Sequence, residues 1–148
     1  MGPRRKGRIL AVQALFAYDF TRCGIDKLTD FSWIGGEDDE DNSHDVGENI
    51  RNFAVLLITG TIENLRVIDS TIQKHLEHWE MSRLKRLDLA VLRVSVFSLC
   101  FMKDIPASVV IDEAVDIVKD FGTDESYRFI NGVLDGIRKT LEDQHEIS

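Results

Sequence analysis

The sequence has few cysteines and prolines and lacks any long apolar run. Its two cysteines, Cys23 and Cys100, lie far apart without a C-x-x-C pair, so we expect reduced thiols in a cytoplasmic protein rather than a disulfide. No apolar run approaches the roughly 20 residues that cross a bilayer, and the charged start does not resemble a signal peptide. We therefore expect no membrane span and no secretion. The two prolines, Pro3 and Pro106, leave most of the chain free to form helices.

Motifs of the common enzyme classes are also absent. The chain contains no G-x-G-x-x-G after a strand, no Walker A lysine, no G-x-S-x-G and no H-E-x-x-H. His75 and His78 could share a metal, but no cysteine or carboxylate cluster completes a site, which favours solvated histidines. Asp112, Glu113 and Asp116 offer neighbouring carboxylates, but adjacent helix positions diverge by about 100°, which favours a polar helix face. These residues place no nucleophile beside a base and predict neither a cofactor nor a metal, but taken alone they leave an enzyme open.

Acidic residues outnumber basic ones, and a cluster of positive charge without acids lies at one end of the chain. The formal net charge is −8, yet the first eight residues contain Arg4, Arg5, Lys6 and Arg8 and no acid, so the rest of the chain carries −12. A protein that coats duplex DNA presents a broad basic face, so any nucleic-acid contact here must be local. Guanidinium groups pair with phosphates, and rings such as Phe16 stack on unpaired bases. The segment therefore favours single-stranded RNA over a duplex.

Apolar residues recur mostly at intervals of three and four, which predicts an all-α fold. The expected helices cover residues 3 to about 23, 45–76, 82 to about 102, 108–121 and 123–143, with a frayed end after them. Ser82, Ser108 and Thr123 are placed as N-caps and Gly122 as a left-handed stop. Gly60 marks a seam or a close packing contact within 45–76. The helix that follows Ser82 is apolar on several sides and is expected to be the central buried element.

Two further expectations concern the packing faces and the loop. Apolar stripes are expected to face the core on the first, fourth and last helices, through Ile9, Val12, Phe16 and Phe20, then Val110, Ala114, Ile117 and Phe121, then Tyr127, Ile130, Leu134, Ile137 and Leu141. The periodicity fails in residues 21–45, where the acidic run 37–41 predicts a solvated loop. The alternative is a regulatory acidic arm that competes with RNA for the basic N-terminus.

Several blocks of sequence occur in order and cover most of the chain outside the acidic loop. They are RRKGR followed by AVQALF at the start, then LDLAVLR at 87–93, DIP at 104–106, IDEA at 111–114, KDFG at 119–122 and FINGVLD at 129–135. This set resembles the NusB family of bacterial transcription antitermination factors. The resemblance implies a NusB-like helical bundle of two perpendicular three-helix subdomains. We expect one domain over 1–148, divided into 1–76, with the acidic loop 21–45, and 77–148.

The resemblance also implies a function without catalysis. Members of the family bind the boxA segment of nascent ribosomal RNA operon transcripts together with NusE, a small-subunit ribosomal protein. This complex joins other Nus factors on RNA polymerase and suppresses termination. Carried over by position, the RNA-binding residues are Arg4, Arg5, Lys6, Arg8, Phe16, Asp88 and Arg128, and the partner-binding residues are Glu125 and Phe129. Phe16 falls where some members have a tyrosine, so a hydrogen bond from a hydroxyl is lost there.

Structural roles are the alternatives at most of these positions. The rings of Phe16 and Phe129 could pack in the core instead of contacting RNA or the partner. Asp88 could pair with Arg93 or Lys85, and Glu125 could be a first-turn residue favoured by the helix macrodipole. If all four basic residues of the first helix met phosphates, the single-strand salt slope would be about −2.8, or roughly fifty-fold between about 50 and 200 mM salt. Replacing these four by alanine is expected to weaken RNA binding and to leave thermal stability nearly unchanged.

Two other functions stay open at the level of sequence. NusB-like domains form the RNA-recognition part of ribosomal RNA cytosine methyltransferases, although we expect no room for a methyl-donor site after Ser148. A helical scaffold that binds only protein, through the acidic loop and the last helix, is the other. Some members of the family also self-associate, and a homodimer of that kind would cover the basic segment.

Overall fold

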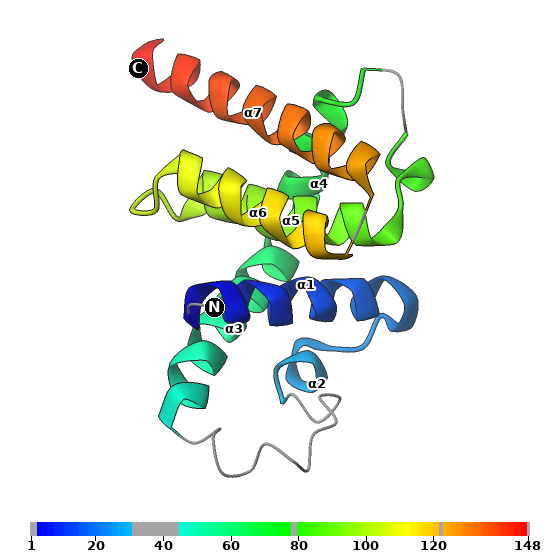
Figure 1. The fold of residues 1–148 in the computed structure, drawn as a ribbon, viewed down its shortest axis with the longest axis vertical. Helices are drawn as coiled ribbons and strands as arrows, with labels where there is room; N and C mark the ends of the chain where they lie inside the picture. Colours follow the sequence, from blue (N-terminus) through cyan, green and yellow to red (C-terminus); the bar gives the residue numbers. More distant parts are fainter. Residues whose placement is uncertain (1–2, 31–44, 78–79, 122, 148) are drawn as a thin grey trace.

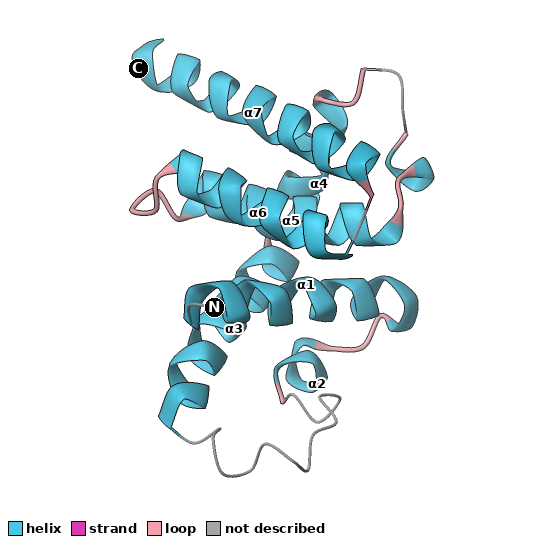
Figure 2. Ribbon diagram, viewed as in Figure 1, coloured by secondary structure: helices cyan, strands magenta, loops and turns pink. Residues whose placement is uncertain are grey.

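Helices make up nearly all of the fold. The computed structural model describes residues 3–30, 45–77, 80–121 and 123–147, and no strand occurs in these ranges (Figures 1 and 2). The elements are α1 (Pro3–Thr21), α2 (Ile25–Thr29), α3 (Asp45–Glu63), α4 (Leu65–Lys74), the short 3-10 helix η2 (Met81–Arg83), α5 (Arg86–Phe101), α6 (Ala107–Phe121) and α7 (Asp124–Ile147). The predicted all-α class is therefore confirmed. None of these helices is long and apolar enough to span a bilayer.

The central helix is α5, as predicted. Its residues from Asp88 to Leu99 are all buried, because α1 and α3 cover one side of it and α4, α6 and α7 cover the other. Figure 1 shows α1 and α3 with the short α2 as one layer, and α5, α6 and α7 stacked beside it as another. One continuous apolar core connects the two layers. The division of the chain between residues 76 and 77 stays a prediction.

Two glycines allow helices to approach closely. A Cβ at Gly60 would overlap the ring of Phe97 on α5, so Gly60 marks a packing contact between α3 and α5 and not a seam between helices. The seam lies at Asn64, whose Nδ2 donates to the Gly60 carbonyl at 2.8 Å and which separates α3 from α4. An asparagine that bonds to nearby backbone in this way competes with the helical ladder. Gly7 has a similar role, because a Cβ there would lie 2.7 Å from Phe53 Cδ2 on α3.

The predicted caps are partly wrong. Ser82 lies in η2, and Lys85 precedes the first residue of α5. Ser108 lies inside α6, because the Pro106 carbonyl accepts from the amides of the first turn, 3.0 Å from Val109 N. Thr123 does cap α7, since its Oγ1 accepts from Ser126 N at 3.2 Å. Sequence alone identified polar residues near each helix start but did not resolve which one occupies the cap.

Other differences concern the loop, the last helix and one packing stripe. The predicted loop contains α2, which Leu28 anchors with only 1% of its surface exposed. The acidic run 37–41 and Gly122 lie outside the described residues. Helix α7 continues to Ile147 instead of fraying after residue 143. Phe121 was expected to face the core but is 57% exposed, because it is the last residue of α6 and extends beyond the helices that cover the core.

Candidate nucleic-acid interface

The four basic residues of α1 separate into two classes. Arg4 and Lys6 are exposed to solvent. The guanidinium of Arg4 lies over the ring of Phe53, 5.4 Å from its centroid, which leaves its N–H donors at the surface. These two side chains can therefore meet a phosphate without breaking an ion pair that the structure records.

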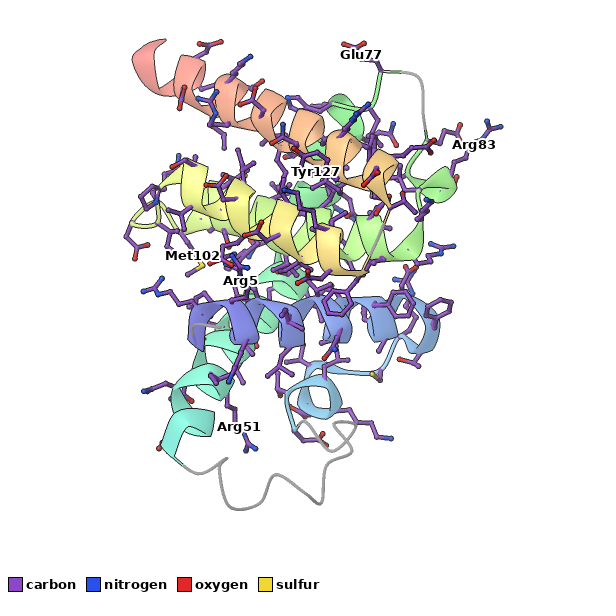
Figure 3. The ribbon with its side chains drawn as sticks, in the orientation of Figure 1. Arg5, Arg51, Glu77, Arg83, Met102 and Tyr127 are labelled. Carbon is purple, nitrogen blue, oxygen red and sulfur yellow. The ribbon has the colours of Figure 1, made fainter. Side chains whose placement is uncertain are left out.

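Arg5 is held by two carboxylates of α6. Its Nε lies 2.6 Å from Glu113 Oε2, and its Nη2 lies 2.7 Å from Asp116 Oδ2. These hydrogen bonds, that to Glu113 above all, raise the pKa of the guanidinium although burial opposes them. In Figure 3 the Arg5 side chain lies in the seam between α1 and the second layer. The carboxylates that resembled an acid–base pair in the sequence thus join the two layers through Arg5.

Arg8 is buried, with only 3% of its surface exposed. Its Nη1 donates to Ser98 Oγ on α5 at 3.1 Å, and its guanidinium lies over the Phe53 ring. Burial lowers the pKa of Arg8, and the charge of Arg4 acts in the same direction. Among the described residues, its Nε has no hydrogen-bond partner. Arg8 therefore fixes α1 between α3 and α5 and is not presented to solvent.

Two phenyl rings are exposed near the other end of α1. Phe16 is 38% exposed and Phe20 is 64% exposed, although both were expected on the core-facing stripe. Their centroids lie 5.1 Å apart in an edge-to-face arrangement, as the four-residue spacing on one helix allows. The stripe leaves the core at this end, because Val12 is 4% exposed and each later member is more exposed. The surface of α1 thus has exposed cations at one end and exposed rings at the other.

An ion-pair network around the buried side chains of Asp19 and Arg93 fixes this aromatic end of α1 to α5. Asp19 Oδ2 lies 2.7 Å from Arg86 Nη1, and Asp19 Oδ1 lies 3.6 Å from Arg93 Nη1. Arg93 also donates from two nitrogens to the carboxylate of Asp69 on α4, at 2.9 and 3.0 Å. Arg93 is therefore engaged with Asp69 and Asp19 and does not pair with Asp88.

A cavity of about 250 Å³ lies where α5 and α7 begin, and we name it the Asp88 pocket. Its lining residues are Arg83, Leu84, Lys85, Asp88, Glu125, Ser126 and Phe129. Asp88 is 5% exposed, and its Oδ2 accepts from Ser126 Oγ at 3.1 Å. Its Oδ1 is buried and has no partner among the described residues. Burial raises the pKa of Asp88, although the Ser126 hydrogen bond and the charge of Lys85 oppose this shift.

The first turns of α7 bring the remaining predicted residues to this region. Glu125 and Phe129 line the Asp88 pocket, and Phe129 also packs against the core. Arg128 is exposed on the same part of the helix. The structure thus brings Asp88, Glu125 and Phe129 together.

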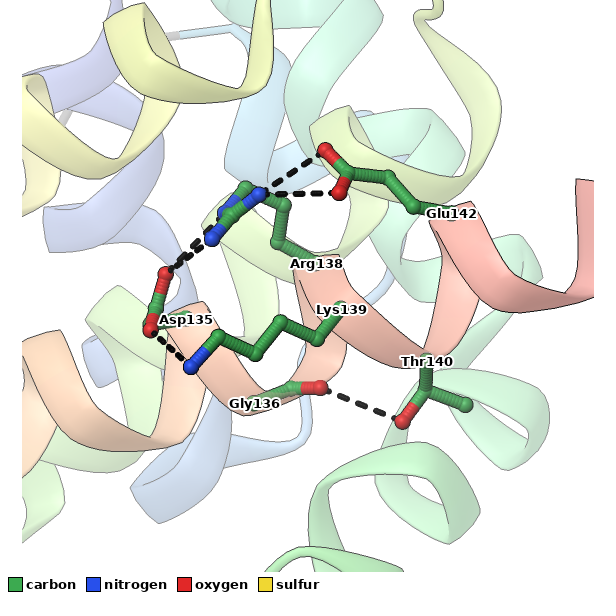
Figure 4. A network of polar contacts seen from close by, with 6 residues as sticks. All are labelled: Asp135, Gly136, Arg138, Lys139, Thr140 and Glu142. Carbon is green, nitrogen blue, oxygen red and sulfur yellow. Dashed lines mark hydrogen bonds and ion pairs between the residues drawn. The ribbon is translucent and has the colours of Figure 1, made fainter.

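The cations farther along α7 are engaged with neighbouring carboxylates. Arg138 bonds to Asp135 and Glu142, and Lys139 lies 3.3 Å from Asp135 (Figure 4). These bonds, with that from Arg138 first, lower the pKa of Asp135. The positive charges of Arg138 and Lys139 are therefore balanced by carboxylates of α7 itself, unlike the charges at the start of the helix.

The candidate metal site of the sequence has no support in the described part of the chain. His75 contacts the Thr71 carbonyl at 2.9 Å and Thr140 Oγ1 at 3.0 Å, which joins α4 to α7. No group of three or more metal-ligating side chains occurs within the described ranges. His78 lies outside them.

Comparison with known proteins decides the family. The model of the NusB family matches residues 5–139. The chain belongs to the NusB family. It is 50% identical over 137 residues to the transcription antitermination protein NusB of Treponema pallidum, with 93% of both chains covered. It is 47% identical over 135 residues to the protein of the same name from Treponema denticola, covering 91% of this chain and 95% of that one.

Solved structures of the NusB family share the fold. T. maritima NusB superposes with a TM-score of 0.75 at 38% identity, covering 94% of this chain and 92% of that chain. A crystal structure of the antitermination factors NusB and NusE in complex with double-stranded RNA gives a TM-score of 0.79 at 28% identity, covering 95% and 98%. The predicted family and the predicted NusB fold are confirmed.

Several residues at this surface of the NusB-family chain were missed by the sequence analysis. Phe20 was assigned to the core, and no role was assigned to Ser126 or Arg83. Lys85 was considered only as a candidate partner of Asp88. The exposure of Phe20 had no sequence signal, because it continues an apolar stripe without interruption. Arg83 and Lys85 precede α5 by only a few residues, and cations beside a carboxylate at a helix start were the available signal.

Proposed function

We propose that this chain is a transcription antitermination factor that binds boxA-type single-stranded RNA together with NusE. In this role it joins other Nus factors on RNA polymerase in the cytoplasm and supports processive transcription of ribosomal RNA operons. Curated relatives with this named function match nearly the whole chain. The observation that carries the proposal is helix α1, which presents exposed cations near its start and exposed rings near its end. The protein acts by binding and not by catalysis.

Each group at this surface suits a different part of an RNA strand. Arg4 and Lys6 bind phosphates, and Phe16 offers a face on which an unpaired base stacks. Asp88 Oδ1, which has no partner in the part of the chain that the structure describes, accepts from the exocyclic amino group of a base that enters the pocket. Stacking requires a base outside a duplex, so the exposed rings favour a single strand over paired RNA.

The two engaged arginines act indirectly. Arg5 and Arg8 position α1 against α6, α3 and α5, and so hold Arg4 and Lys6 in place. Only two cations of the basic segment are then free for phosphates. They contribute a salt slope of about −1.4, or roughly sevenfold between about 50 and 200 mM salt. This is half the slope expected when all four basic residues contact RNA.

A surface this small leaves the isolated chain with weak affinity for RNA. Glu125, Phe129 and Arg128 lie together at the start of α7, where a protein partner can join the RNA surface. NusE bound there supplies a second RNA contact, and two weak sites on one particle gain from effective concentration. We therefore expect RNA affinity to rise when NusE is present.

A titration of boxA-like RNA tests this proposal. Labelled RNA is titrated with the chain alone and with the chain plus NusE, and unlabelled duplex RNA of the same sequence serves as competitor. We expect weak binding to the chain, tighter binding with NusE and poor competition by the duplex. Equal affinity with and without NusE would discard the cooperative model. No binding in low salt even with NusE would overturn the RNA function and favour a scaffold that binds only protein.

A further inference from the structure

The rim of the Asp88 pocket carries two cations that the proposed function has not yet used. Arg83, in η2, and Lys85, directly before α5, are both exposed and line the pocket. In the described part of the structure, Arg83 makes no recorded ion pair. Lys85 Nζ makes one long bond, 3.5 Å to Thr123 Oγ1. Figure 3 shows Arg83 at the right edge of the view, away from Arg5, which lies in the seam between the two layers.

The pocket itself indicates a ligand. Asp88 is 5% exposed, and its buried Oδ1 at the wall of the cavity has no hydrogen-bond partner within the described ranges. A buried carboxylate oxygen without a hydrogen bond is costly, so a donor that enters the pocket is favoured. The volume of about 250 Å³ lies just below the range of roughly 300–1,000 Å³ for drug-sized ligands. It therefore suits one small planar group and not a folded segment of protein.

The charged residues of the pocket form two groups, a buried one at its floor and an exposed one at its rim. Asp88 forms the buried part, whereas Arg83, Lys85 and Glu125 are exposed. Without the two cations, the carboxylates would repel an RNA backbone. The first turns of α5 and α7 also meet here, and helix N-termini carry partial positive charge and free N–H groups. An anionic group is thus favoured at the rim and an N–H donor inside.

We propose that Arg83 and Lys85 form a second phosphate site, which holds the RNA backbone beside the nucleotide whose base enters the Asp88 pocket. This inference rests on the proposed RNA function and extends it. The strand is then held at two cationic points, Arg4 with Lys6 at the start of α1 and Arg83 with Lys85 at the pocket. The Asp19–Arg86 ion pair fixes the far end of α1 to the start of α5, and so keeps the two points at a constant separation.

The experiment is a salt titration of RNA affinity in the presence of NusE. The test variant is Arg83→Gln with Lys85→Gln. The control is Arg66→Gln with Lys103→Gln, which removes the same charge from exposed positions outside the pocket. Each lost phosphate contact lowers the slope by about 0.7, so we expect the test variant to lose about 1.4 in slope and roughly 25-fold in affinity at about 0.1 M salt. The control should bind like the wild type.

Two further arms identify the source of any loss. The exchange Arg83→Lys with Lys85→Arg keeps both charges and should restore most of the affinity. NusE binding measured without RNA should be the same for the wild type and the test variant. An unchanged salt slope, an equal loss in the control, or a loss of NusE binding in place of RNA binding would each overturn the inference.

The same measurements separate this inference from the function on which it rests. If Arg4→Gln with Lys6→Gln lowers the slope and the rim variant does not, the RNA function stands and the second phosphate site does not exist. If the wild type ignores RNA in low salt with NusE present, both fail.

Discussion

Substituting the basic segment in two pairs should separate stability from RNA binding. The first pair, Arg5→Gln with Arg8→Gln, removes the engaged arginines. The second pair, Arg4→Gln with Lys6→Gln, removes the exposed ones. Both double variants lose two positive charges from the same helix, so each is the matched control of the other.

The magnitudes follow from the contacts of each residue. Arg5 loses two partly exposed ion pairs, at 2.6 and 2.7 Å, each worth roughly 0.2–1 kcal/mol. Replacing Arg8 removes buried packing and the donor that Ser98 Oγ accepts from, which costs about 1–3 kcal/mol. A total of about 1.4–5 kcal/mol lowers Tm by roughly 4–15 °C in a chain of this size. The exposed pair should change stability by less than about 1 kcal/mol.

Thermal unfolding followed by circular dichroism measures the first effect, and RNA titration measures the second. We expect the engaged pair to lower Tm strongly. We expect the exposed pair to keep Tm and to reduce the salt slope by about 1.4. If both double variants melted like the wild type, the assignment of Arg5 and Arg8 as positioning residues would be refuted.

Three further predictions concern packing, pH and stacking. Gly60→Ala should lower the free energy of unfolding by about 1–3 kcal/mol because the methyl group overlaps Phe97. Gly132→Ala, with open space around it, should raise the free energy of unfolding by up to about 1 kcal/mol. Urea titrations measure both values, and equal effects would contradict the packing contact. The Tm of Asp88→Asn should rise relative to that of the wild type as pH increases from about 3 to 7. Burial raises the pKa of Asp88 above about 3.9, so the unfolded wild type loses this proton first and the wild-type stability falls as pH rises. A difference in Tm that is independent of pH would contradict this. Phe16→Leu should keep Tm and weaken RNA binding by about 1–3 kcal/mol, as fluorescence anisotropy would show, and unchanged affinity would remove Phe16 from the surface.

The helices and the central position of α5 could be predicted from sequence because periodicity alone determines them. Spacing of apolar residues at three and four places identified the core-facing stripe of α7 and part of those of α1 and α6 without tertiary information. Exact starts were harder, as Ser82 and Ser108 show, because several polar residues near a helix start compete to cap it. The short helix α2 was missed because five residues are too few for a periodic signal.

The candidate site was predicted only in part, for a physical reason. Residue type identified the basic segment, but which of its cations are free to bind RNA depends on which neighbours approach each position of α1. Arg5 and Arg8 are engaged by Glu113 and Ser98, more than 80 residues later in the chain. Local pattern contains no information on such contacts. The same holds for Gly60, whose role depends on the ring of Phe97 on another helix.

The most direct test of the account is a map of the RNA surface by NMR. The isotope-labelled chain is titrated with boxA-like RNA in low salt, and amide shift changes are followed residue by residue. We predict the largest changes around Arg4, Lys6 and Phe16 on α1 and around Asp88 and Lys85 at the pocket. Changes confined to α4 or to the second half of α7 would contradict the account.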